Sequence, residues 1–181
     1  RLRVVHASPD APAVDIYAKG VATPLLTNVA YGAVSSYLEV PAGTYEIEVR
    51  AAGSTGPAAY TTGPLALVDG QTVTAVAAGL LAPTGSDDAF RVLALDENFD
   101  AVAANSVRVR IVHASADAPT VGIDVGADNP AAPEVASLAR FADTGAAGIA
   151  LPAGQALRIG VVAGDAQVTS FTTPALPSGA E

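Results

Sequence analysis

The fold is decided by a stretch of twelve residues that the chain contains twice. RLRVVHASPDAP occupies residues 1–12, and RVRIVHASADAP occupies residues 108–119. In both copies apolar and polar side chains alternate up to the histidine, which is typical of a β-strand with one buried face. His6 then shares a face with Leu2 and Val4, and the arginines lie on the other face. The repetition predicts two copies of one β-domain.

Short alternating segments and turn signals follow each copy. Residues 38–49 align with residues 149–160 around a shared Pro-Ala-Gly. Each segment predicts a hairpin, because Pro presets φ at the first turn position and Gly accepts the left-handed one. In the first copy an Asp-Gly turn at residues 69–70 leads into an apolar strand over residues 71–81, and residues 90–95 form another strand. About eight strands and no helix predict an all-β fold, an antiparallel β-sandwich of Ig-like or Greek-key type.

The repeat also predicts the domain boundaries. We expect a first β-sandwich over residues 1–95, a polar linker over residues 96–106 and a second β-sandwich over residues 107–181. The two Pro-Ala-Gly turns are 111 residues apart, so the second copy is expected to lack about two C-terminal strands, those of residues 71–95. Three explanations stay open: a trimmed chain, closure with fewer strands, or strands donated by a neighbouring molecule.

Composition excludes several classes of function. The net charge is −9 and no basic patch is present, which argues against nucleic-acid binding. No apolar run reaches about 18 residues, so no transmembrane segment is expected. The chain has no cysteine, which excludes disulfides and thiolate sites, and it has no methionine, even at position 1. We therefore expect a secreted or cell-surface protein from which a signal peptide has been removed.

The phrase R-[LV]-R-[VI]-V-H-A-S-x-D-A-P-x-V and the later Pro-Ala-Gly turn resemble DUF4397, a bacterial and archaeal domain family of unknown function. The resemblance covers residues 1–95 and, in the second copy, residues 108–181. It implies a β-sandwich module, export to the cell exterior and tandem copies, and it assigns no catalytic residue. The second copy departs from the first, since Gly122 aligns with Asp15. A site built on Asp15 is therefore expected in the first copy only.

The polar residues of the phrase are expected to be structural. They are His6, Ser8, Asp10 and Pro12 in the first copy, and His113, Ser115, Asp117 and Pro119 in the second. Ser and Asp side chains bind nearby backbone N–H groups and shape turns, and proline ends strand pairing. A buried histidine needs a partner, for which Asp10 or a turn carbonyl is available. We interpret the phrase as a structural corner.

Two chemical alternatives compete with that interpretation. His6 with Asp10 or Asp15 could hold a divalent cation, and His6 with Ser8 could form a catalytic pair. Each copy has one histidine, however, and no third orienting residue or oxyanion loop is evident in the sequence. We therefore do not expect an enzyme.

Calcium is the one candidate cofactor, and its candidate ligands are Asp96, Asn98 and Asp100. Their D-x-N-x-D spacing places oxygens at alternate positions, as at the start of a calcium loop. An EF-hand would also need Gly and Glu where the chain has Ala101 and Val107. The segment is therefore a calcium site of another kind or a solvated acidic linker.

All five tyrosines lie in the first copy, at positions 17, 31, 37, 45 and 60. Such rings can stack on sugars, or they can fill a core that has few other large side chains. We therefore expect a non-catalytic extracellular structural or interaction module, with self-assembly into a surface layer or filament by strand complementation, or adhesion to other surface proteins. The alternative is a carbohydrate-binding or small-ligand module in the first domain.

Overall fold

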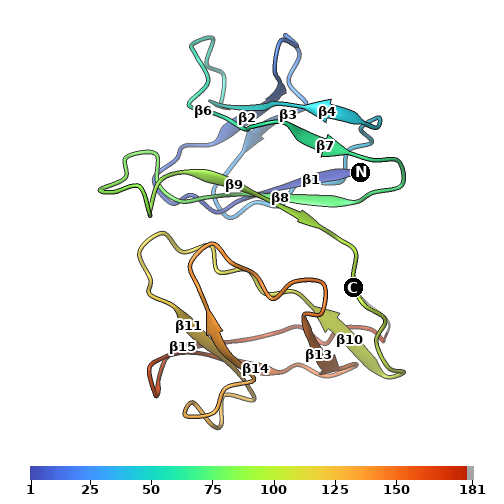
Figure 1. The fold of residues 1–181 in the computed structure, drawn as a ribbon, viewed down its shortest axis with the longest axis vertical. Coiled ribbons are helices and arrows are strands. Elements are labelled where there is room, and N and C mark those ends of the chain that lie inside the picture. The colour runs from blue at the N-terminus through green and yellow to red at the C-terminus, as the bar shows by residue number, and fades with distance from the viewer. Residues whose placement is uncertain (179–181) are drawn as a thin grey trace. The chain divides into compact units, whose positions relative to one another are not determined.

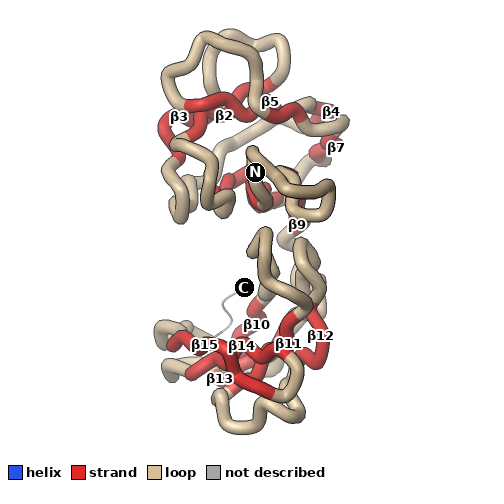
Figure 2. The backbone as a smooth tube through the Cα atoms, turned by 90° about the vertical axis from the view of Figure 1, so that its left-hand side faces the viewer, coloured by secondary structure: helices blue, strands red, loops and turns tan. Residues whose placement is uncertain are grey.

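The computed structural model describes residues 1–178, and this part of the chain consists of strands and loops with no helix (Figure 2). The predicted all-β class is confirmed. The chain divides into two compact units. The first unit comprises Arg1–Glu97 and Ala114–Ala116, and the second comprises Asn98–His113 and the chain from Asp117 on. No helix in the described part is long and apolar enough to cross a membrane.

The first unit contains nine strands in two main sheets and a strand pair (Figure 1). One sheet has the order β1-β8-β9, with β1 (Leu2–His6), β8 (Val73–Ala78) and β9 (Arg91–Asp96). The other has the order β3-β2-β5-β6, with β3 (Leu26–Val29), β2 (Val14–Ala18), β5 (Ile47–Ala51) and β6 (Tyr60–Thr61). The pair consists of β4 (Gly43–Tyr45) and β7 (Leu65–Leu67).

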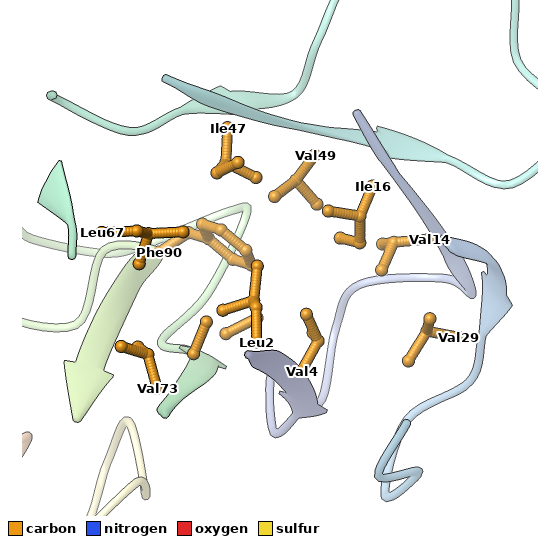
Figure 3. Packing of buried hydrophobic residues seen from close by; sticks show 12 residues of the cluster. Leu2, Val4, Val14, Ile16, Val29, Ile47, Val49, Leu67, Val73 and Phe90 are labelled. Atoms are coloured by element: carbon orange, nitrogen blue, oxygen red, sulfur yellow. The ribbon is translucent and has the colours of Figure 1, made fainter. Parts of the chain in front are cut away.

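The core of the first unit lies between these sheets. Leu2 and Val4 project from β1 toward Ile16 and Val49 of the opposite sheet, and Phe90 closes one end (Figure 3). The buried residues are those that the alternation of β1 predicts, since Leu2, Val4 and His6 are buried and the residues between them are partly exposed. The pleat of the strand places every second side chain on one face.

The pairing of β1 with β8 corrects the expectation of a purely antiparallel sandwich. The two strands run parallel, with Leu2 beside Val73 and His6 beside Ala77. Parallel neighbours require a long crossover connection. Here the crossover is the whole of the opposite sheet, which the chain builds between β1 and β8. Local sequence patterns carry no information on such a distant partner.

The Pro-Ala-Gly segments do not form the predicted hairpins. Before the first turn, Leu38 forms a bridge with Leu2 of β1, and after it β5 pairs with β2 and β6. In the second unit β13 pairs with β10, while β14 pairs with β11 and β15. The chain therefore passes from one sheet to the other at each turn. Of the two turn glycines, only Gly154, in the second unit, is left-handed, with a φ of +77°, and a proline before the turn allows a corner as readily as a hairpin.

Up to residue 178, the second unit contains six strands in two sheets, one of them two-stranded. The smaller sheet pairs β10 (Ser106–Val109) with β13 (Ile149–Pro152). The larger has the order β12-β11-β14-β15, with β12 (Val135–Leu138), β11 (Val121–Val125), β14 (Arg158–Ala163) and β15 (Ala166–Thr172). Its buried cluster consists of Val121, Ile123, Leu138 and Ile159, which is smaller than the cluster of the first unit.

Candidate functional site: the repeated corner

His6 ends β1 with its side chain fully buried and both ring nitrogens engaged. Nε2 lies 3.0 Å from the carbonyl oxygen of Pro12, and Nδ1 accepts a hydrogen bond of 3.3 Å from the Ser8 N–H. This pair of partners fits the tautomer that carries its proton on Nε2. Of the two partners that the sequence suggested for His6, the turn carbonyl is the one used. The imidazole therefore ties the end of the strand to the corner that follows it.

Ser8 and Asp10 connect this corner to the end of β8. The Ser8 hydroxyl, which is fully buried, donates to the Gly79 carbonyl at 2.7 Å. The Asp10 carboxylate accepts hydrogen bonds from the N–H groups of Leu81 and Ala82, both at 2.9 Å. Burial opposes ionisation of Asp10, but these bonds and the nearby Ser8 hydroxyl outweigh it and lower the pKa of the carboxyl group.

Gly79 is required where the corner meets the β8–β9 connection. Its φ is +83°, and a Cβ there would lie 2.4 Å from the carbonyl oxygen of Ala89. A larger residue would therefore clash with the backbone as well as strain its own. The phrase thus holds the tight β8–β9 turn of its own sheet in place.

The second copy repeats the histidine bond. His113 Nε2 lies 2.9 Å from the carbonyl oxygen of Pro119, and His113 is buried like His6. The serine differs in its surroundings, because Ser115 is exposed, whereas Ser8 is fully buried; Asp10 and Asp117 are both exposed. The histidine link is therefore common to both units, and the enclosed serine belongs to the first.

The side chains suggested for a metal site or a catalytic pair do not converge. Asp15 accepts bonds from the backbone N–H groups of Asn28 at 2.8 Å and Gly53 at 2.9 Å, and Asp10 faces the β8–β9 turn. The Ser8 hydroxyl donates to a carbonyl rather than to the His6 imidazole. Within residues 1–178, no three histidine, aspartate or glutamate side chains form a group that could hold a metal ion.

The candidate calcium ligands fall in different units. Asp96 is the last residue of β9, whereas Asn98 and Asp100 belong to the second unit. The N–H of Asp100 donates to the Ala146 carbonyl at 3.3 Å. Calcium binding at this segment stays a prediction.

The tyrosines are divided between core and surface. Tyr45 and Tyr60 pack against the core of the first unit, and the Tyr60 ring centroid lies 5.0 Å from that of Phe90. Tyr31 and Tyr37 are exposed. The core-filling interpretation therefore holds for two of the rings, and two lie on the surface. The fifth, Tyr17, is half-buried, with the Arg50 guanidinium 4.8 Å from its ring centroid.

Two polar features were missed by sequence reasoning. The alignment that pairs Gly122 with Asp15 places Asp124 opposite Tyr17. Asp124 is nevertheless buried and accepts a hydrogen bond from the Asn129 N–H at 3.0 Å, as Asp15 accepts bonds from its neighbouring loops. It lies two residues further from its histidine than Asp15 does, and a shift of two keeps a side chain on the same face of a strand. A search allowing insertions of two residues would have found it.

The other missed feature is a cluster around Glu97 on the outer face of the β1-β8-β9 sheet. The Glu97 carboxylate accepts hydrogen bonds from Thr74 and from Tyr37, the latter at 2.7 Å, and pairs with Arg3 at 3.1 Å. Burial raises the pKa of Glu97, but these three partners outweigh it and bring the pKa below its ordinary value. No local motif announces this cluster, because its members come from distant segments.

Comparison with known proteins gives one family. The model of a domain of unknown function, DUF4397, matches residues 1–124. The match covers the whole first unit and extends through the second copy of the phrase into β11. No curated protein matches the chain.

Proposed function

The chain belongs to the DUF4397 family, and from that premise we propose that it is a non-catalytic structural or interaction module of the cell exterior. One observation carries the proposal: the polar side chains of the repeated phrase bind the protein's own backbone. His6 faces the Pro12 carbonyl, Ser8 the Gly79 carbonyl and Asp10 two N–H groups of the β8–β9 turn. Groups used in this way shape a corner rather than act on a substrate.

The setting that we propose is a surface layer, a filament or an adhesive stalk, reached by export. The repeated phrase, the absence of cysteine and the acidic composition support a module that works beside its own copies or other surface proteins. Self-association through the sheets of such a module needs no cofactor.

Light scattering tests the self-assembling part of this proposal. The 181-residue chain would be diluted over a hundredfold range and its mass compared with the 17.9 kDa of one copy. We expect a mass above that of one copy at the highest concentrations, falling on dilution. One copy at every concentration would contradict self-assembly and leave adhesion to other proteins as the interaction to test.

A hollow in the first unit favours the second candidate function, binding of a carbohydrate or another small ligand. It has a volume of about 420 Å³, and its lining includes Tyr45, Lys19 and Glu46. An aromatic ring beside charged and hydroxyl groups suits a polyhydroxylated ligand. Glycan titration of the chain and of its Lys19→Ala variant would test this function. Binding that the variant weakens supports it, and no binding to any glycan contradicts it.

A further inference from the structure

The hollow of the first unit lies where the ends of β2 and β4 meet the start of β7. Its lining comes from the residues after β2, from the β4–β5 junction and from the residue before β7: Lys19, Val21, Thr44, Tyr45, Glu46 and Pro64. The volume of about 420 Å³ lies within the range of small-ligand sites, roughly 300–1,000 Å³. The hollow therefore has the size for a short carbohydrate or another compact ligand.

The polar part of the hollow is a fixed pair of opposite charges. The Lys19 N–H donates to the Glu46 carbonyl at 2.8 Å, and the Lys19 ammonium donates to the Glu46 carboxylate at 2.9 Å. The bond to Glu46 raises the pKa of Lys19, so the ammonium group stays charged at neutral pH. The two side chains are 51% and 39% exposed. An ammonium group has three donors and a carboxylate two acceptor oxygens, so the pair can serve the hydroxyl groups of a ligand as well as each other.

The charges of this pair favour an uncharged ligand. Lys19 is the only lysine of the chain, and Glu46 balances it. The next carboxylate that acts on Lys19, Glu48, is itself paired with Arg50 at 2.6 Å. An anionic ligand would have to displace Glu46 from Lys19 in a chain of net charge −9, and a cationic ligand would have to displace Lys19 from Glu46.

The rest of the hollow offers apolar surface and one hydroxyl group. Val21 is 50% exposed, and Pro64 is exposed beside it in the same lining. The Tyr45 hydroxyl donates to the Pro41 carbonyl at 2.9 Å, which fixes the ring at the wall of the hollow. Thr44 is exposed, and its hydroxyl can both donate and accept. A sugar that carries only hydroxyl groups would leave the valine and the proline in water.

We propose that this hollow binds an N-acetylated amino sugar. The sugar hydroxyls bridge Lys19 and Glu46, and the acetamido methyl group packs on Val21 and Pro64. The acetamido group meets both requirements of the lining, since it carries a methyl group together with an N–H donor and a carbonyl acceptor that the Thr44 hydroxyl can bind. The inference rests on the second candidate function, carbohydrate binding, and names its ligand class.

The single lysine gives a direct test by nuclear magnetic resonance. Reductive methylation with ¹³C-formaldehyde places two methyl groups on Lys19 and keeps its charge, and the methylated α-amine of Arg1 gives a separate resonance. The labelled chain would be titrated with the disaccharide of N-acetylglucosamine. We expect a saturable shift of the Lys19 resonance. Cellobiose, the same disaccharide with hydroxyl groups in place of the acetamido groups, should bind at least about tenfold more weakly, because it lacks the methyl and amide contacts.

Two valine variants locate the site. Val21→Asp should weaken binding of the N-acetylglucosamine disaccharide at least about tenfold, because it places a carboxylate where the methyl group packs. Val68→Asp is the matched control, since Val68 is 63% exposed in the same unit and lies outside the lining. The control should bind like the parent chain. Equal weakening by the two substitutions would overturn the proposed location.

The outcomes separate this inference from the proposed function. Equal affinity for cellobiose and for the N-acetylated disaccharide overturns the ligand class and leaves carbohydrate binding standing. A disaccharide of glucuronic acid that binds more tightly than either overturns the argument from charge. No resonance shift with any of these sugars, together with no heat of binding in calorimetry of the unmethylated chain, overturns the inference and the second candidate function together. Light scattering still decides self-assembly in each case.

Discussion

His6 and His113 stand at matching corners, yet their surroundings differ. Each histidine is buried, and each faces a proline carbonyl six residues further on, at 3.0 and 2.9 Å. The backbone around them also matches, since the His6 N–H donates to Ala33 and the His113 N–H to Ala142. Beyond that point the first phrase reaches the β8–β9 turn through Ser8, whereas Ser115 is exposed. The two seven-residue phrases, which differ only in Pro9 and Ala116, therefore specify a corner without specifying what closes the sandwich beside it.

The two units thus separate the local and non-local contributions to one fold. The corner needs only its own residues and the neighbouring loop. Closure needs a strand pair that lies more than 60 residues away along the chain in the first unit. The predictions below test whether that strand pair accounts for the difference between the units.

The largest expected effect is a loss of first-unit stability when its aromatic pair, Tyr60 and Phe90, is broken. Phe90→Ala should destabilise the first unit by about 3–5 kcal/mol, because it removes a buried ring and leaves a cavity beside Tyr60. Phe171→Ala should change the stability of the second unit by no more than about 0.5 kcal/mol, as at a surface position. Urea unfolding followed by tyrosine fluorescence reports the first unit, which holds all five tyrosines, and circular dichroism reports both. Equal costs for the two substitutions would contradict the comparison.

The next effect concerns the link from the corner to β8. Ser8→Ala should cost about 1–3 kcal/mol, because the buried Gly79 carbonyl loses its hydroxyl donor. Ser36→Ala, at an exposed position of the same unit, provides the matched control and should have little effect. Tyrosine-detected unfolding measures both variants. A Ser8→Ala chain as stable as the control would show that the phrase does not hold the β8–β9 turn.

The smallest expected effect is the response to acid, which both units should show through different carboxylates. Arg3 pairs with Glu97 of the first unit, while its counterpart Arg110 pairs with Asp143 of the second at 2.6 Å. Burial opposes ionisation of both carboxyl groups, but their hydrogen bonds and arginine partners lower the pKa of each. The stabilisation is therefore complete above the unfolded pKa, about 4 for such groups, and is lost as pH falls through the folded value.

Matched variants assign the acid response to each unit. Glu97→Gln should reduce the loss of first-unit stability below about pH 4.5, by roughly 1 kcal/mol, and leave that of the second unit unchanged. Asp143→Asn should do the opposite. Urea unfolding at a series of pH values, read by tyrosine fluorescence and by circular dichroism, distinguishes them. A pH dependence that neither substitution alters would show that these ion pairs do not cause the loss of stability in acid.

Local patterns in the sequence predicted some features of this structure and could not predict others. The alternation of Leu2, Val4 and His6 predicted the strand and its buried face, because side chains on a strand alternate regardless of its partner. The parallel pairing with β8 and the corner at Pro41 depend on which distant segment lies alongside, which periodicity does not encode. The Glu97 cluster could not be predicted for the same reason, because its members come from distant segments. The carbonyl partner of His6 was within reach of sequence reasoning because it lies six residues away.

Native-state hydrogen exchange at Val4 and Ile111 tests the central claim most directly. Both amides donate to a hydroxyl oxygen, Val4 to Ser35 at 2.9 Å and Ile111 to Thr144 at 3.0 Å, so the hydrogen bonds themselves are alike. If the β8–β9 hairpin is what closes a sandwich, Val4 should exchange at least about 100-fold more slowly than Ile111, a difference of about 2.7 kcal/mol in opening free energy. Equal protection of the two amides would mean that the second unit is closed as firmly as the first and would contradict the account.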